Sequence, residues 1–375
     1  MSWQTYRLGD VITLKRGHDL PESQRQGGEV PIVSSSGITG YHNEPKAKAP
    51  GVVTGRYGTF VEVFYIEQDY WPLNTALYVT DFKGNHPRFV AYFLQNVLRN
   101  YQSDKAAVPG VNRNDLHDMK VRSTDPQSQG RIGSILSAYD DLIENNRRRM
   151  ALLEEAARQL YREWFVRLRF PGHEHTHITD GAPEGWEKTN ASQAMSILSG
   201  RTPKTSVPDF WDGDIPFYTP KDASDHCYVL ETECSVTELG LKNYNSRLYP
   251  RDTIFISARG TVGKLNLAYQ PMAMSQSCYA LVGQGHVSQF FLYCALRESI
   301  KHLKQHAVGA VFNAIVVDTF KRIPFLMPDA KSVKLFEKTV APMLNQVGNL
   351  IQQNQKLRAA RDLLLPRLMS GEITV

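Results

Sequence analysis

The stretch SARGTVGKLNLAY, Ser257 to Tyr269, occurs a second time in altered form as TGRYGTFVEVFYI, Thr54 to Ile66. In both copies an arginine stands shortly before a glycine, and a threonine follows that glycine. The residues on either side of the later copy's glycines alternate apolar and polar, as the strands of a half-buried sheet do. The stretch therefore predicts a β-hairpin with a tight glycine turn, used twice in one chain.

A nucleotide-binding loop is the competing interpretation of the same stretch, because it contains glycines, a hydroxyl and a lysine. A P-loop needs four residues between its glycines, followed by Lys and then Ser or Thr. Only two residues separate Gly260 from Gly263, and a leucine follows Lys264. The earlier copy has Val61 and Glu62 where the later one has Gly263 and Lys264. The hairpin is therefore predicted to be a scaffold element whose loop exposes binding residues.

Further pairs of similar segments lie in the same order in the two halves of the chain. The chain is therefore predicted to be one module of roughly 170–190 residues used twice, a size within the range of single domains. The paired segments are Trp3 with Trp186, Leu14–Gly17 with Ile197–Gly200, Val30–Ser35 with Ile215–Pro220, Leu73–Val79 with Ser275–Leu281, and Val111–Val121 with Phe312–Ile323.

Each module ends in a long heptad pattern, which predicts two long helices that pack together. The first stripe has Ile132, Tyr139, Leu153 and Leu160 at one position and Ile135, Leu142 and Ala156 at the other. The second stripe has Val340, Val347 and Leu368 at one position and Phe336, Met343, Leu350, Leu357 and Leu364 at the other. Asn146 and Asn354 fall within these stripes, where a buried asparagine fixes the helix register. A solvated asparagine on a wide stripe is an equally good interpretation.

Composition and charge bound the class of protein. The 375 residues suffice for two domains, and 42% hydrophobic content excludes a disordered chain. The net charge of +5 allows a nucleic-acid partner without requiring one. No CxxC pair, apolar leader or membrane-length apolar run is present, so we expect a soluble, reduced, cytoplasmic protein without a membrane partner. The Pro/Gly-rich residues 171–185 read as a linker, and its histidines lack the partners of a metal site.

The chain resembles one protein family over essentially its whole length, and three further segments carry most of the resemblance. LLLPRLMSGEI (Leu363–Ile373), LLEEAARQLYREWFV (Leu152–Val166) and APEGWE (Ala182–Glu187) are similar to segments of the specificity subunit of Type I restriction-modification enzymes. The resemblance implies an α+β protein in which two tandem mixed α/β target-recognition domains are separated by two long helices packed as an antiparallel coiled coil. The expected boundaries are 1–128 and 186–328 for these domains, 129–170 and 329–375 for the helices, and 171–185 for the linker.

The resemblance also implies a function. Each domain would read one half of a bipartite DNA site, and the helices would set the gap between the halves. The subunit would have no catalytic activity or cofactor of its own. Its partners would be double-stranded DNA, two methyltransferase subunits and restriction-translocase subunits, and S-adenosylmethionine, ATP and magnesium would belong to those subunits.

The residues themselves agree with a non-catalytic role, since we find no adenine-methyltransferase motif, P-loop or Ser/His/Asp signature. Two other functions stay open, namely a DNA-modifying enzyme that acts alone and a coiled-coil adaptor that never touches DNA. Loop residues with exposed hydrogen-bond donors are the candidates for DNA contact. They are Ser35, Ser36, Arg56, Tyr57, Thr59, Asn112 and Arg113 in the first module, and Tyr218, Lys221, Arg259, Thr261, Lys264 and Asn313 in the second. A structural arginine is the alternative for Arg56 and Arg259, and a helix or turn cap for both asparagines.

Overall fold

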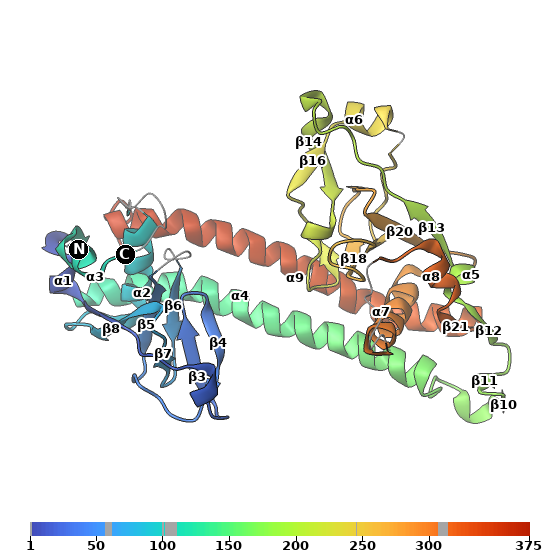
Figure 1. Cartoon of the computed structure of the whole chain (residues 1–375), viewed down its shortest axis with the longest axis horizontal. Helices are drawn as coiled ribbons and strands as arrows, with labels where there is room; N and C mark the ends of the chain where they lie inside the picture. The colour runs from blue at the N-terminus through green and yellow to red at the C-terminus, as the bar shows by residue number, and fades with distance from the viewer. Residues whose placement is uncertain (1, 57–61, 100, 102–110, 245, 307–313) are drawn as a thin grey trace. The chain divides into compact units, whose positions relative to one another are not determined.

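The chain forms two compact units of mixed helix and sheet, seen in a computed structural model (Figure 1). The structure describes residues 2–56, 62–99, 101, 111–244, 246–306 and 314–375, with the backbone alone for 301–306. Unit 1 consists of Met1–Glu144 and Gln355–Val375, and unit 2 of Asn145–Asn354. The prediction of two tandem domains of mixed helix and sheet is confirmed.

Unit 1 contains an antiparallel four-stranded sheet in the order β2-β8-β5-β6 and a three-stranded sheet in the order β4-β3-β7. A separate pair joins β1 to β9. The strands are β1 Gln4–Arg7, β2 Thr13–Arg16, β3 Val30–Ser34, β4 Gly37–His42, β5 Gly51–Gly55, β6 Val63–Ile66, β7 Trp71–Pro72, β8 Ala76–Asp81 and β9 Lys120–Ser123. The helices are α1 Leu8–Val11, η1 Glu22–Gln24, α2 Pro87–Arg99 and α3 Arg113–Asp118.

Unit 2 repeats this plan, with one five-stranded sheet in the order β13-β20-β17-β18-β15 and a three-stranded sheet in the order β16-β14-β19. Its separate pair joins β12 to β21. The strands are β12 Glu187–Asn190, β13 Met195–Ser199, β14 Trp211–Tyr218, β15 Tyr228–Val229, β16 Cys234–Val236, β17 Ile254–Ser257, β18 Leu265–Ala268, β19 Ala273–Met274, β20 Cys278–Gly283 and β21 Pro324–Met327. The helices are α5 Ala191–Ala194, η4 Pro208–Phe210, η5 Pro220–Asp222, α6 Glu238–Asn243, α7 Gln289–His306 and α8 Val317–Lys321.

The internal repeat is confirmed at the level of single contacts. Val33 accepts a backbone hydrogen bond from Leu73, and Tyr218 accepts the same bond from Ser275. Gly17 and Gly200 also occupy the same place, because a Cβ atom on either would lie 2.1 Å from the carbonyl oxygen of Leu73 or Ser275. Only glycine permits so close an approach of two backbones.

Both predicted hairpins are present as the antiparallel pairs β5–β6 and β17–β18. Their alternation follows from burial on two faces, since successive side chains of a strand point to opposite sides. Val52 packs in the core beneath α2, whereas Val53 packs toward the three-stranded sheet. Ile256 and Phe255 divide in the same way in unit 2. The prediction of a tight turn was wrong for the hairpin of unit 2, because residues 258–264 form a longer loop between β17 and β18.

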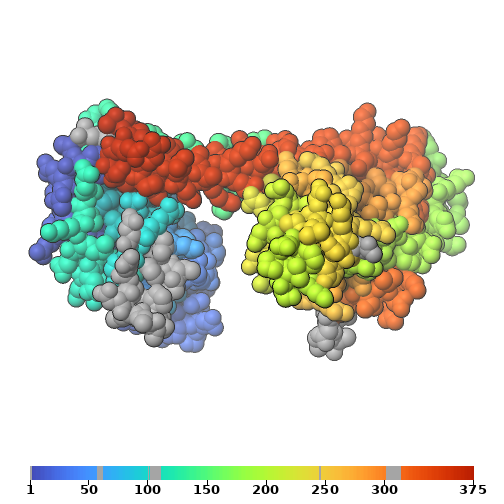
Figure 2. All heavy atoms as spheres, turned by 90° about the horizontal axis from the view of Figure 1, so that it is seen from above, coloured from blue at the N-terminus to red at the C-terminus, as the bar shows by residue number. Residues whose placement is uncertain are grey.

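The core of unit 1 is completed by the C-terminal end of the chain. Leu365 and Leu368 belong to the same buried cluster as Phe89 and Leu94 of α2 and Ile132. Figure 2 shows the last turns of this segment, coloured dark red, on the surface of unit 1 next to the blue N-terminal strands. The first module therefore depends on residues more than two hundred positions away in the sequence.

Two long helices, α4 Pro126–Tyr161 and α9 Ala330–Ser370, contribute to both units. In unit 2 they run in opposite directions, since Asn146 contacts Asn354 and Tyr161 packs on Phe336. A π-helical turn, Arg162–Val166, follows α4.

Of the residues predicted for the second apolar heptad position of α4, namely Ile135, Leu142 and Ala156, two were predicted wrongly. Leu142 and Ala156 are exposed, whereas their neighbours Ile143 and Ala157 are buried. The buried face is therefore rotated by one residue relative to the predicted stripe.

Residues 171–185, predicted as a linker, carry a short turn and a small hairpin. The turn is η3 His173–His175, and the hairpin pairs β10 Ile178–Thr179 with β11 Ala182–Pro183. His173 Nδ1 lies 2.8 Å from the carbonyl oxygen of Phe170. The segment is thus locally ordered by its own hydrogen bonds.

Candidate nucleic-acid interface

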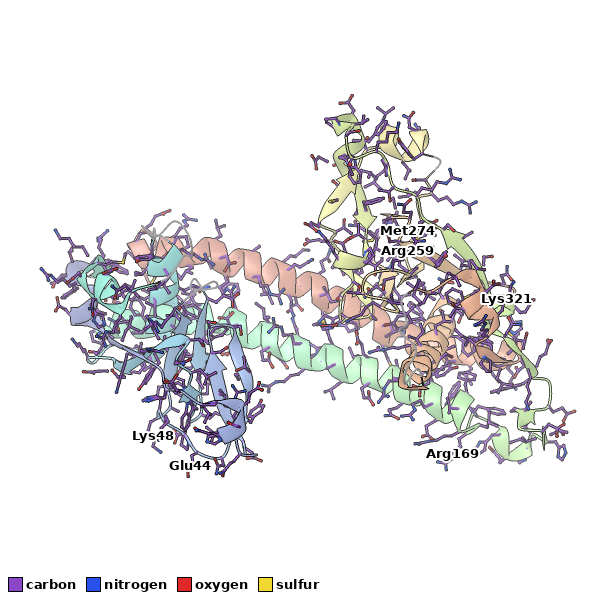
Figure 3. All side chains as sticks on the ribbon, viewed as in Figure 1. Glu44, Lys48, Arg169, Arg259, Met274 and Lys321 are labelled. Atoms are coloured by element: carbon purple, nitrogen blue, oxygen red, sulfur yellow. The ribbon has the colours of Figure 1, made fainter. Side chains whose placement is uncertain are left out.

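Two loops of unit 2 bring several predicted DNA-contacting residues together. Thr261, in the loop between β17 and β18, donates its hydroxyl hydrogen bond to the carbonyl oxygen of Pro220 at 3.0 Å. This contact joins that loop to the η5 turn, which carries Lys221. Thr261, Lys221 and Arg259 are all exposed. Figure 3 labels Arg259 in unit 2.

The three basic side chains of these loops differ in how strongly they are engaged. Lys264 Nζ lies 2.5 Å from Asp225 Oδ1, and this ammonium lowers the pKa of Asp225. Lys221 Nζ lies 3.7 Å from Glu233, with both side chains mostly exposed. Among the described residues, the Arg259 guanidinium makes no hydrogen bond or ion pair. Because an unpaired cation is the most available for an anionic partner, Arg259 is the strongest phosphate- or base-contact candidate in unit 2.

Tyr218 must be removed from the predicted interface, because its side chain is fully buried. Its ring stacks on Phe255 with centroids 5.0 Å apart, and its hydroxyl donates to Asn266 Oδ1 at 3.0 Å. Burial raises the pKa of the Tyr218 hydroxyl. The residue lies in β14 on the side that faces the larger sheet, so it supports the loops without reaching solvent.

In unit 1 the predicted arginine Arg56 is tied to the backbone around it. Its side-chain Nη1 lies 3.4 Å from the carbonyl oxygen of Asn74, and its own carbonyl accepts the N–H of Val111 at 2.8 Å. Arg16 Nε donates to the same Asn74 oxygen at 3.3 Å. Two guanidinium groups therefore meet at one carbonyl, which makes this loop end basic.

The remaining described candidates of unit 1 divide between exposed and capping roles. Ser35 is half-buried and Ser36 exposed in the turn between β3 and β4, where Ser36 Oγ lies 3.0 Å from Ser34 Oγ. Asn112 caps α3, because its Oδ1 accepts the N–H of Asn114 at 3.0 Å. Arg113 is exposed beside it. Tyr57, Thr59 and Asn313 lie outside the described residues.

Arg56 and Arg259, which correspond in the two similar stretches of sequence, do not occupy equivalent positions in the structure. Arg56 donates its N–H to Thr75 and accepts from Val111, and the residue of unit 2 that makes the matching bonds, to Ser277 and from Ile315, is Ala258. Arg259 stands one residue further along, in the loop. The two arginines that stand shortly before a glycine in the sequence therefore occupy different places in the fold.

The pairing of Asn112 with Asn313 fails for the same reason. Asn112 is the N-cap of α3, and the N-cap of the corresponding helix α8 is Val316. The second module has no asparagine at that cap. Val316 therefore holds the place of Asn112 in the second module, just as Ile315 holds that of Val111.

Two residues that organise the loops were missed by the sequence. Asn266 in β18 donates to the carbonyl oxygens of Ser224 (3.1 Å) and His226 (2.8 Å), so one buried amide shapes the loop after η5. Arg16, the second residue, lies in the repeated segment Leu14–Gly17 but was not among the predicted DNA-contact residues. A polar residue in an otherwise apolar strand is the signal that could have drawn attention to Asn266.

Two further kinds of site are not seen in the part of the chain that the structure describes. No group of three or more His, Cys, Asp or Glu side chains is placed to hold a metal ion there. No described helix combines the length and apolar character needed to cross a lipid bilayer.

The sequence of the chain matches one protein-family model over most of its length. The model for the Type I restriction modification DNA specificity domain matches residues 1–155 and 183–360. The chain belongs to this Type I restriction-modification specificity family. Each matched range holds one copy of the repeat, so the resemblance seen in the helical segments extends through both modules.

Individual members of the specificity family are similar over most of the chain. The HindI specificity subunit of Haemophilus influenzae is 24% identical over 336 residues, covering 72% of this chain and 73% of that protein. The MjaIX specificity subunit of Methanocaldococcus jannaschii is 25% identical over 286 residues, covering 73% of this chain and 65% of that one. A solved S subunit from M. genitalium superposes with a TM-score of 0.65 at 15% identity, over 98% and 96% of the two chains. At that identity the likeness establishes the fold alone.

Proposed function

We propose that the chain is the sequence-specific DNA-recognition subunit of a Type I restriction-modification complex. The domains at 1–128 and 186–328 each read one half of a bipartite target. The observation that carries this proposal is the repeat itself, because the strand order β2-β8-β5-β6 recurs as β13-β20-β17-β18, extended by β15, with different loops. Two homologous readers with unlike loops fit a target with two unlike halves.

The segments 129–170 and 329–375 form an antiparallel coiled coil that separates the two recognition domains, with 171–185 as the linker. The contacts between α4 and α9 support this proposal. Asn146 Nδ2 donates to Asn354 Oδ1 at 2.9 Å, and Asp140 is ion-paired with Arg361. Polar pairs of this kind select one register of two apolar helix faces.

The DNA contacts come from the loops. In unit 2 we assign them to Arg259, Lys221 and Thr261, which are exposed and held on neighbouring loops. Lys264 contributes charge, although Asp225 competes for it. In unit 1 we assign contacts to Arg56, Ser35, Ser36 and Arg113, with Asn112 in a capping role. Tyr57, Thr59 and Asn313 remain candidates by sequence.

The partners of the chain are double-stranded DNA, two methyltransferase subunits that dock on the helices, and restriction-translocase subunits. The chain itself acts without catalysis. S-adenosylmethionine, ATP and magnesium belong to the partner subunits. The relatives named as specificity subunits support this division of labour.

An exchange of one domain tests the proposal. We replace residues 1–128 with the equivalent region of a relative, reconstitute the complex with its methyltransferase subunits, and sequence the methylated motif. One half of the motif should change while the other half is kept. The reciprocal exchange of 186–328 is the matched control and should change the other half. A motif in which both halves change together would contradict independent reading.

Two measurements on the chain alone separate the rival functions. A DNA-modifying enzyme would transfer a methyl group from S-adenosylmethionine to duplex DNA without a partner, and we expect no transfer. A coiled-coil adaptor would show no DNA affinity, whereas phosphate contacts require an affinity that falls as salt rises.

A further inference from the structure

One arginine in unit 1 bridges the edge of the larger sheet and the long helix. Arg88 of α2 is ion-paired with Glu67, the residue after β6, and its Nη1 lies 3.3 Å from Asp141 Oδ1 in α4. Its guanidinium also lies 4.9 Å from the ring centre of Tyr65 in β6. Strand edge, helix and arginine thus meet at one point, which we name joint 1.

A second arginine makes an analogous bridge in unit 2. Arg251, which precedes β17, donates from Nη2 to Asn345 Oδ1 in α9 at 3.0 Å. Its guanidinium lies 4.5 Å from the ring centre of Tyr269 and 5.7 Å from that of Tyr228. The Tyr269 hydroxyl donates to Asn349 Oδ1 of the same helix at 3.2 Å. We name this point joint 2.

The two joints occupy the same place in the repeated fold. Glu67 directly follows β6, and Tyr269 directly follows the equivalent strand β18. Asp141 and Asn345 stand equally far beyond Asp125 and Asp329, whose carboxylates accept the corresponding N–H groups near the starts of α4 and α9.

The arginines themselves come from different elements, one from α2 and one from the loop before β17. A bridge built twice from different sequence positions points to a requirement of the place rather than to shared ancestry of the residue.

The joints differ in how closely they are packed. On α9, Gly348 lies beneath the aromatic rings, and a Cβ there would be 2.7 Å from Tyr269 Cε2 and 3.2 Å from Tyr228 Cδ2. The corresponding residue of α4 is Glu144, and beside it a pocket of about 290 Å³ remains open, lined by Arg88, Glu67 and Asp141 among others. Joint 2 is therefore close-packed and reaches its helix through a neutral side chain, whereas joint 1 reaches its helix through an ion pair and is open to water.

Neither joint involves the loops that carry the DNA-contact candidates. Each fastens the recognition module to its own helix at the sheet edge, so a small rotation there displaces the loops of the module as a lever would. We propose that Arg88 and Arg251 are positioning residues that fix the angle of each module on its helix, and thereby the gap between half-sites that the chain accepts. This inference rests on the proposed function.

The two joints should respond differently to salt. Glu67 and Asp141 are 70% and 65% exposed, so their attraction to Arg88 is screened as ionic strength rises. Arg251 is ion-paired with Asp252 of its own module, with Nε 3.6 Å from Oδ1. Its contacts to the helix side are a neutral asparagine and two aromatic rings, and these contacts depend little on salt. Because salt weakens the ion pairs of joint 1, we expect the chain to bind targets with an altered gap relatively better as the salt concentration rises.

The test uses the full-length chain and duplex DNA. Selection from a random duplex pool first defines the bipartite site of the wild type, and a series of duplexes then varies only the gap by one base pair in each direction. We measure the affinities of the wild type, Arg88→Met and Arg251→Met for this series. Methionine keeps an unbranched apolar stem and removes the guanidinium. Discrimination between gaps should fall by about fivefold or more, a usual size for coupling between separate sites, with the half-sites unchanged.

Arg158→Met is the matched control, because Arg158 lies on α4, is ion-paired within that helix with Glu155, and is about as exposed (26%) as Arg88 (28%). It should leave gap discrimination intact. Asp141→Asn and Arg251→Lys serve as gentler variants if a methionine variant fails to fold. Unchanged discrimination in folded variants of both joints, or altered half-site sequences, would overturn the inference. A wild type that selects no bipartite site would instead refute the proposed function.

Discussion

Asn146 of α4 and Asn354 of α9 are hydrogen-bonded to each other through their buried side chains, with Nδ2 of Asn146 2.9 Å from Oδ1 of Asn354. The same Nδ2 lies 3.1 Å from Gln353 Oε1. Apolar residues flank the pair, among them Ile143 and Leu350. Sliding one helix by a turn would place an amide against an apolar side chain, so this pair favours one register at some cost in stability.

Replacing one partner should cost more than replacing both. Asn146→Leu removes the buried donor from which Asn354 Oδ1 accepts a hydrogen bond, and we expect a loss of about 1–3 kcal/mol of unfolding free energy. The double variant Asn146→Leu/Asn354→Leu should recover most of that loss, because two apolar groups then face each other. Urea unfolding of the two single variants and the double variant gives the cycle, and Gln352→Ala on the exposed side of α9 is the control. Additive losses would contradict a direct coupling.

The first turn of α4 should be sensitive to acid. The backbone N–H and hydroxyl of Ser128 lower the pKa of Asp125 from 3.8 to about 2. A carboxyl group with a depressed folded-state pKa stabilises the fold above its unfolded pKa, and this stabilisation is lost as the pH falls from about 4 to about 2. The difference in melting temperature between the wild type and Asp125→Ala should therefore shrink over that window.

Asp125→Asn is the matched control for this titration, because asparagine caps helices well and carries no titratable group. Because the titrating group is Asp125 of the wild type, the difference in melting temperature between the wild type and Asp125→Asn should start from a smaller value at neutral pH and change by about the same amount over this window as the difference for Asp125→Ala. A difference between Asp125→Ala and wild type that stays constant down to pH 2 would contradict the assignment.

The repeat was predictable because strands bury alternate residues and tight backbone contacts demand glycine. The match of Val30–Ser35 with Ile215–Pro220 holds residue by residue, since both strands lie parallel to a short strand in the same register. Gly17 and Gly200 hold because their neighbours leave no room for a side chain. Constraints of this kind act at single positions, so they survive divergence of the surrounding sequence.

The loops and the helix faces were harder to predict for physical reasons. Loop length differs between the copies, so matching letters paired Arg56 with Arg259 instead of Ala258. Tyrosine is a residue type that can stack on DNA bases, but Tyr218 points inward, where its ring packs on Phe255 and its hydroxyl donates to Asn266. In α4, adjacent apolar residues such as Leu142 and Ile143 fit a heptad equally well on paper, and packing decides between them.

Arg259 should matter for DNA affinity and little for stability. Its side chain is exposed at a loop tip, so Arg259→Ala should leave the melting temperature unchanged. Loss of a phosphate contact would weaken all sequences alike and flatten the salt dependence by about one unit, whereas loss of a base contact would relax one position by about 1–3 kcal/mol.

Arg169→Ala is the control, since Arg169 is also exposed but lies well apart from Arg259 in the view of Figure 3. Equal loss of affinity in both variants would indicate a general effect of net charge, and unchanged affinity in Arg259→Ala would remove this residue from the interface.

Gly348→Ala should behave against the usual preference of helices. Alanine normally stabilises a helix interior by about 1 kcal/mol relative to glycine. Here the added methyl group would meet the ring of Tyr269 at 2.7 Å, so the ring must leave its place beside Arg251. We expect no gain in unfolding free energy. Gly130→Ala in α4 is the matched control, because its Cβ would meet only His86 at 3.8 Å and should stabilise. Equal gains at both positions would show that Tyr269 is not held there.

If the two long helices space the recognition domains, lengthening both should lengthen the gap in the target. We insert one heptad after Glu144 in α4 and one before Gln355 in α9, between the layer of Asp140 and Arg361 and the layer of Asn146 and Asn354. Seven residues add ~10 Å and return the helix to within about 20° of its former facing. At ~3.4 Å per base pair the gap should grow by about three base pairs, with both half-sites unchanged. Sequencing the methylated motif of the reconstituted complex measures this directly. An insertion in α4 alone should instead separate Asn146 from Asn354 and abolish activity. An active double insertion with an unaltered gap would refute the spacer role of the helices.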